Sequence, residues 1–148
     1  MTKVRIDKKA TDVARKIWRQ VGYCEATDVP AKVWVCKSVQ SGNKSPQLQG
    51  AHIFGVGAYP RLKVDLRNGM SLCSNCHRHF TSSPIEFADF IRKTKYKKYL
   101  EPLKDRNNGD KVKVFWDEKI AELRDVLKQI QAGELTVDEA RKYEDEDS

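Results

Sequence analysis

Apolar residues recur at intervals of three and four positions in several stretches of the chain, and this spacing predicts amphipathic helices. We expect four such helices, over residues 11 or 12 to 21, 83 to 93, 117 to 132, and a short one that opens at 136. Gly22 and Gly133 follow the first and third of these segments as stop signals. Ser83-Pro84-Ile85-Glu86 is typical of a capping box at a helix start. The segment 117–132 has the most regular apolar stripe and is the clearest helix.

Other stretches are β-branched and aromatic, a composition that favours short strands. Val33-Trp34-Val35 and Val112-Lys113-Val114-Phe115 are two such stretches, and residues 67–72 suit a returning strand. Residues 41–50 contain mainly turn-forming and polar side chains, which predicts an exposed loop. Helices together with a few short strands predict an α+β fold.

Length and composition restrict the class of protein. The chain has 148 residues, which suits one domain of ordinary size with extensions. Apolar residues make up 39% and charged residues 33%, the composition of a soluble globular protein. No apolar run is long enough to span a membrane, and the first residues lack the apolar core of a secretory signal. A membrane or secreted protein is therefore not expected, and the expected location is the cytoplasm.

Positive charge is concentrated in the first three quarters of the chain. Residues 1–114 contain 23 Lys and Arg against 10 Asp and Glu, whereas residues 115–148 contain 5 against 11. A strongly basic segment suits a polyanion such as DNA. For the run 92–99 we favour a contact with the DNA backbone over a solvated helix end, because two tyrosines alternate there with five basic residues: Arg92, Lys93, Lys95, Lys97 and Lys98.

The chain has four cysteines: Cys24, Cys36, Cys73 and Cys76. In a reducing compartment, metal ligands or reactive thiols are favoured over disulfides. The two-residue spacing in Cys73-Ser74-Asn75-Cys76 lets one tight turn direct both thiolates at a single ion. A tetrahedral structural Zn²⁺ then needs two more ligands, which Cys24 and Cys36 can supply. The alternatives are a histidine ligand, His77 or His79, and four buried cysteines without metal.

His52 lies in the apolar run Ala51-His52-Ile53-Phe54, where a lone histidine is commonly a packed core residue. Two motifs downstream favour a functional role instead, Asn68-Gly69 and Leu72-Cys73-x-x-Cys76-His77. Their order and spacing resemble the His-Asn-His motif of HNH nucleases. The stretch Tyr59-Pro60-Arg61-Leu62 is similar to that of phage-type members. The resemblance covers about residues 24–95.

This resemblance implies a ββα-metal finger, in which two strands and a helix hold one catalytic divalent ion beside the structural zinc. It implies that His52 is the general base that takes a proton from water, and that Asn68 holds His52 by a hydrogen bond. It also implies that His77 is a ligand of a catalytic Mg²⁺, Mn²⁺ or similar ion. Such an endonuclease cuts or nicks DNA and leaves a 5′ phosphate and a 3′ hydroxyl.

Two positions depart from the family pattern. Ala51 stands where many members have Asp or His as a second metal ligand, and Thr81 stands where another ligand often lies. His79, Asp65 or a substrate phosphate would then have to complete the shell of the catalytic ion. A non-catalytic zinc module that binds DNA is therefore the first alternative. The second is an interaction adaptor whose protein partner binds the apolar stripe of the helix at 117–132.

The expected organisation is α+β, a zinc-braced HNH finger with flanking helices. The finger occupies residues 24–95, in the cytoplasm of a bacterial or phage-infected cell. The other expected segments are a basic N-terminal helix over 1–23, a basic connector over 96–114, and a C-terminal helix with an acidic tail over 115–148.

Overall fold

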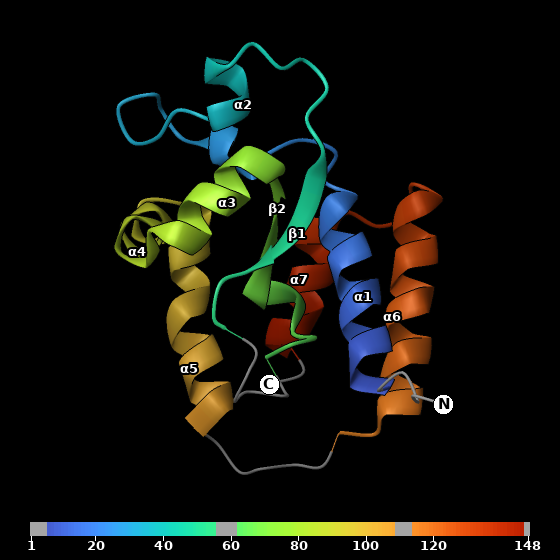
Figure 1. Ribbon diagram of the computed structural model, residues 1–148. Helices are drawn as coiled ribbons and strands as arrows, with labels where there is room; N and C mark the ends of the chain where they lie inside the picture. The colour runs from blue at the N-terminus through green and yellow to red at the C-terminus, as the bar shows by residue number, and fades with distance from the viewer. Residues whose placement is uncertain (1–5, 56–61, 109–113, 147–148) are drawn as a thin grey trace, which may run out of the picture.

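A two-stranded antiparallel hairpin lies at the centre of the protein, with helices on both sides (Figure 1). The computed structural model describes residues 6–55, 62–108 and 114–146 of the chain. β1 (Leu48–His52) pairs with β2 (Gly69–Cys73) so that Gly50 lies opposite Ser71 and His52 opposite Gly69. α3 (Ser74–Ser82) follows β2 directly, because the Cys73 thiol accepts a hydrogen bond from the backbone N–H of Cys76 at its first turn. The described residues are therefore α+β, and their central unit runs strand, strand, helix.

One helix covers the face of the hairpin that carries Gly50 and Gly69, and a second helix packs behind it. α1 (Ile6–Arg19) packs against both strands, and α6 (Trp116–Gln131) packs on the other side of α1 (Figure 1). Their shared core includes the fully buried Ile17 and Trp18 of α1, together with Leu123 of α6. The apolar stripe predicted for residues 117–132 is thus turned inward, since its partly buried members also pack against this core.

The other face of the hairpin, with Ala51, Met70 and Leu72, belongs to a second core. The helices that contribute side chains to this core are α3, α4 (Pro84–Arg92), α5 (Leu100–Asn108), and two 3₁₀ turns, η1 (Glu25–Asp28) and η3 (Lys95–Tyr99), while α2 (Lys37–Gln40) packs against α3. Tyr96 and Tyr99 are buried here. The segment expected as a basic connector therefore contributes to the core.

Buried charged side chains close the outer edge of β2. The backbone N–H of Ser71 donates to Glu25 Oε1 at 2.9 Å, and the carbonyl of Gly69 accepts from Arg141 Nη2 at 3.0 Å. Arg141 belongs to α7 (Val137–Glu146), and its Nη2 also lies 3.3 Å from Glu25 Oε1. Both side chains are fully buried. They satisfy backbone groups that a third strand would otherwise bind.

α7 confirms the expected short final helix and extends it. Thr136 and Glu139 form a capping box, because each side chain accepts a hydrogen bond from the other residue's backbone N–H. The helix continues to Glu146, so the start of the acidic tail is helical. Glu144 is buried and accepts hydrogen bonds from Leu66 N and Arg106 Nη1.

Several sequence predictions were wrong in detail. Val33-Trp34-Val35 is not a strand, because Val33 N and Trp34 N both donate to the carbonyl of Pro30 and form a turn. The tight turn brings the Trp34 ring to 4.5 Å from that of Phe80, centroid to centroid. Of the strand expected at 112–115, the first two residues lie outside the described ranges and the last two are not in a strand.

The expected loop and returning strand also shift. The end of the loop at 41–50 forms β1, and the returning strand starts two residues late, since Leu66–Asn68 form the 3₁₀ turn η2. Asp65 caps this turn by accepting from Arg67 N. The helix at 84–92 is present without the expected capping hydrogen bond from Ser83, and Glu86 binds His79 instead.

The contact between α1 and the hairpin depends on a missing side chain at position 69. A Cβ added to Gly69 would lie 2.1 Å from the buried Trp18 ring, although the extended backbone there would accept alanine. We therefore expect Gly69→Ala to lower the free energy of unfolding by about 1–3 kcal/mol or more. Gly55→Ala is the matched control, because nothing lies within 4 Å of its added Cβ. Urea unfolding measures both, and equal midpoints would contradict the close packing.

Candidate metal centre and the adjoining histidines

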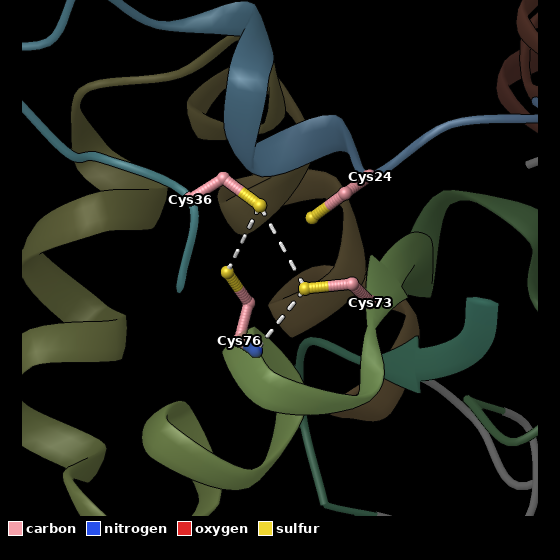
Figure 2. A group of neighbouring side chains, drawn as sticks. All are labelled: Cys24, Cys36, Cys73 and Cys76. Atoms are coloured by element: carbon pink, nitrogen blue, oxygen red, sulfur yellow. Dashed lines mark hydrogen bonds between the residues drawn. The ribbon is translucent and has the colours of Figure 1, made fainter. Parts of the chain in front are cut away.

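Four buried thiol groups converge from four segments of the chain. Cys24 precedes η1, Cys36 precedes α2, Cys73 ends β2, and Cys76 lies in the first turn of α3. Figure 2 shows the four sulfur atoms facing one another, and all of them lie within 4.8 Å of each other. The predicted four-cysteine cluster is confirmed, and neither histidine proposed as an alternative ligand belongs to it.

The spacing of the sulfur atoms fits a tetrahedral metal site. Cys36 Sγ lies 3.7 Å from both Cys73 Sγ and Cys76 Sγ. Four thiolates around Zn²⁺, each at about 2.3 Å, would lie about 3.8 Å apart. Backbone N–H groups also point at the sulfurs, since Lys37 N donates to Cys76 Sγ at 3.2 Å. Hydrogen bonds of this kind stabilise negative thiolate, so the donor set suits a divalent ion that prefers sulfur ligands.

The cluster already favours one thiolate over the others. The hydrogen bond from Cys24 is the largest cause that lowers the pKa of Cys76, and the Lys37 N–H acts in the same direction. The same interaction with Cys76 raises the pKa of Cys24, and burial raises that of Cys36. A divalent cation would remove this difference among the four cysteines, because it binds all four sulfurs as thiolates.

His52 is the last residue of β1 and lies beside α1. Its ring packs edge-on against Trp18, with the ring centroids 5.0 Å apart. Nε2–H donates to the carbonyl of Lys63 at 3.0 Å, which leaves Nδ1 with a free lone pair. Burial lowers the pKa of His52 to about 4, and the charge of Arg15 adds to this effect. The imidazole is therefore neutral near pH 7, the form in which it can accept a proton.

His77 lies on α3, one residue after the last cysteine, and is tied to β1. Its Nδ1–H donates to Gln49 Oε1 at 2.6 Å, so Nε2 keeps the lone pair that a metal requires. Burial and then Arg15 lower its pKa. The charge of His77 would also lower the pKa of His52, which places the two rings within electrostatic reach of each other.

Asn68 corrects one expectation. Both hydrogens of its amide go to backbone carbonyls, those of Phe54 and Leu62, and its Oδ1 accepts from Phe54 N at 2.8 Å. Asn68 therefore does not hold His52 directly, as the resemblance implied. It binds the backbone of Phe54, two residues after His52, and so fixes the path of the chain where β1 ends. Its amide makes its hydrogen bonds with the backbone groups closest to it.

Other candidate ligands have different partners. His79 Nε2 is bonded to Glu86, and its ring packs on Trp34 at 5.0 Å between centroids. Asp65 is fully buried in ion pairs with Arg67 and Arg106. Thr81 Oγ1 donates to the carbonyl of His77. Of the residues considered for the catalytic ion, His77 is the one that a side chain of β1 holds through a hydrogen bond.

The basic run 92–99 has a mixed environment. Lys95 lies 3.3 Å from Glu25 and 3.4 Å from Asp138, and Lys93 lies 2.9 Å from Asp89, so both charges are partly neutralised. Tyr96 and Tyr99 are buried and cannot stack on bases. Arg92, Lys97 and Lys98 are exposed. A contact between this run and DNA stays a prediction, and it would involve the basic side chains alone.

Two residues next to the histidines were missed from the sequence. Gln49 holds His77, and Arg15 lies near enough to lower the pKa of both histidines. Arg15 did carry a signal, since it belongs to the polar face of a predicted basic helix. Gln49 carried none, because it stands in a stretch that resembled a loop.

The chain matches no protein-family model, no curated protein and no solved structure. None of the helices in the described ranges has both the length and the apolar character needed to cross a membrane.

The cluster generates a direct test of metal content. We expect one zinc per chain in the purified protein, and its loss in Cys76→Ser, since a structural site contributes about 10–16 kcal/mol of apparent binding free energy. The variant should also unfold at a much lower temperature. Ser74→Ala, in the same turn, is the matched control and should keep its zinc. Elemental analysis and thermal melting measure both, and wild-type protein free of metal would refute the site.

Proposed function

We propose that this chain is a metal-dependent endonuclease of the HNH kind, with one structural zinc, that hydrolyses DNA phosphodiester bonds. The observation that carries the proposal is the strand-strand-helix unit in which β1 carries one partly buried imidazole and binds another, each with one ring nitrogen left unprotonated. His52 is the last residue of β1, and Gln49, also on β1, binds His77. The cysteine cluster supports it, because Cys73 and Cys76 fix the junction between β2 and α3 next to His77.

In this proposal His52 is the general base. The Lys63 carbonyl accepts a hydrogen bond from its Nε2–H, so Nδ1 holds the lone pair that removes a proton from a water molecule. The resulting hydroxide attacks phosphorus while the bond from phosphorus to the 3′ oxygen breaks. The 3′ oxygen then takes a proton from solvent, which leaves a 5′ phosphate and a 3′ hydroxyl. The Trp18 ring and the Lys63 carbonyl hold the base in one orientation.

His77 is the proposed protein ligand of the catalytic ion. Its Nδ1–H is held by Gln49 Oε1, the arrangement that fixes the tautomer of a metal-binding histidine. A bound Mg²⁺ or Mn²⁺ would stabilise the charge that develops on the phosphate and on the departing oxygen. Since Ala51 and Thr81 supply no ligand, oxygen atoms of the substrate phosphate would complete the shell.

The same two positions favour the second candidate, a zinc module that binds DNA without cutting it. Ala51 is buried opposite Met70, and the Thr81 hydroxyl is bonded to the His77 carbonyl. Incubation of supercoiled plasmid with the zinc-loaded protein, with and without Mg²⁺ or Mn²⁺, separates the two. Nicking that requires the divalent ion supports the nuclease, and binding without nicking supports the module.

The role of His52 gives a mutational test. His52→Ala should lower the cleavage rate by about 10²–10⁴-fold, because it removes the proton acceptor, while zinc content stays unchanged. Added Mn²⁺ should not restore cleavage. His79→Ala is the matched control, since that ring is held by Glu86 and Trp34. A folded His52→Ala protein that cuts at the wild-type rate would show that His52 is a core histidine.

The role of Gln49 gives a second test, on the metal. Gln49→Leu should raise the Mg²⁺ or Mn²⁺ concentration needed for half-maximal cleavage by about 10–100-fold, because His77 loses its orienting partner. Saturating metal should recover most of the rate. Gln47→Leu, two residues earlier in the chain, is the control and should leave the metal dependence unchanged. Equal metal dependence in Gln49→Leu and wild type would contradict the role of His77.

A further inference from the structure

Three basic side chains form a row along α1. Lys8, Arg15 and Arg19 are spaced by seven and four residues, so they lie on one side of the helix. The row is about 16 Å long at the rise of an α-helix. One acidic residue, Asp12, lies within the row. It is 3.8 Å from both Lys8 and Arg15, and its side chain is about half exposed. These loose pairs in contact with water neutralise little of the positive charge.

This row is held close to β1. A Cβ added to Gly50 would lie 2.7 Å from the Cα of Arg15, so α1 crosses the strand at that point with almost no space between them. Gly50 is the neighbour of Gln49 in β1, and His52 follows two residues later. The crossing therefore places Arg15 beside the strand that carries His52 and binds His77.

The side chain of Arg15 starts at this crossing, because its Cα and Cβ both lie against Gly50. It remains 43% exposed. Its charge also lowers the pKa of His52, the residue two positions after Gly50. An exposed guanidinium at the strand that carries His52 leaves a net positive charge there, and this arrangement suits an anion.

The run at 92–99 is a less favourable surface for the same anion. It lies between α4 and α5, on the other side of the hairpin from α1 (Figure 1). Glu25, Asp28 and Asp138 all lie within 4 Å of Lys95. Among the described residues, the α1 row forms ion pairs with one acid, Asp12, and the row crosses the strand that carries His52.

We propose that α1 binds the backbone of duplex DNA through Lys8, Arg15 and Arg19, and that Arg15 contacts the phosphate beside His52 and His77. A straight row of cations suits the regular line of phosphates along one strand of a duplex, and the planar fork of Arg15 can bind two phosphate oxygens. The assignment of that phosphate as the one that is cut rests on the proposed function. The contact between α1 and DNA does not.

Binding without divalent ions tests the contact. The probe is a blunt-ended DNA duplex, titrated at several salt concentrations against wild type, Arg15→Gln, Asp12→Asn and Arg124→Gln. Glutamine keeps the Cβ of Arg15 that packs on Gly50, so Arg15→Gln should melt at the wild-type temperature. Arg124 is an exposed arginine on α6 and serves as the matched control.

Arg15→Gln should reduce the slope of log affinity against log salt by about 0.9, the contribution of one phosphate contact. Asp12→Asn should bind more tightly than wild type at low salt, and Arg124→Gln should behave as wild type. If wild type does not bind the duplex, or if Arg15→Gln and Arg124→Gln give the same slope, the inference is wrong. Tighter binding to an RNA hairpin with the same ranking of variants would overturn the assignment to DNA.

Cleavage separates this inference from the proposed function. At saturating DNA and metal, Arg15→Gln should cut about 10²-fold more slowly, because it removes a group that stabilises charge on the reacting phosphate. Wild type that binds DNA in the expected manner but never cuts would reject the nuclease and keep the α1 contact. If Arg15→Gln cuts as fast as wild type at saturating DNA and metal, the nuclease stands and the assignment of Arg15 to the phosphate that is cut is wrong.

Discussion

Convergence of four thiol groups at the junction between β2 and α3 is the constraint on which the rest of the structure depends. A hairpin of two short strands is marginal by itself, and its helix is only nine residues long. The cluster joins this unit to the two segments that carry Cys24 and Cys36. A bound zinc would contribute free energy comparable to the whole stability of a domain. The side chain of His77, the next residue after the cluster, is therefore placed by the same constraint.

A buried ionic network connects this unit to α7. Glu25 follows the first cysteine and binds Ser71 N, the Tyr96 hydroxyl and Arg141 of α7. The field of Arg141 opposes the effect of burial on the pKa of Tyr96, although burial is the larger effect and the pKa is raised. An unpaired charge in this buried environment would cost several kcal/mol, so we expect the loss of any one member to destabilise the others. The metal cluster, the outer edge of β2 and the last helix are thus coupled.

Sequence patterns predicted those parts of the structure that a single local rule decides. The stripe from Ile120 to Ile130 requires an amphipathic helix, and the Thr136 capping box is complete within four residues. The spacing of Cys73 and Cys76 predicted the cluster. Trp34 was misread as part of a strand because its ring packs against Phe80, a contact across 46 positions that no local pattern contains.

The site shows the same division. The motif identified His52 and His77 as candidates, while their partners Lys63, Gln49 and Arg15 lie outside the motif and are chosen by packing. Gly50 and Gly69 explain how this is possible, since both remove side chains where α1 crosses the hairpin. The expected bond from Asn68 to His52 failed for a related reason, because a buried amide satisfies the closest backbone groups first.

We expect zinc to bind four sulfurs and to leave His77 outside its shell, as the proposed function requires. X-ray absorption at the zinc edge of the purified protein tests it most directly, because sulfur and nitrogen neighbours differ in distance and in scattering. We predict that four sulfur atoms surround the zinc at about 2.3 Å and that no nitrogen binds it. A shell of three sulfurs with one nitrogen at about 2.0 Å would contradict it, since a histidine would then be a structural ligand.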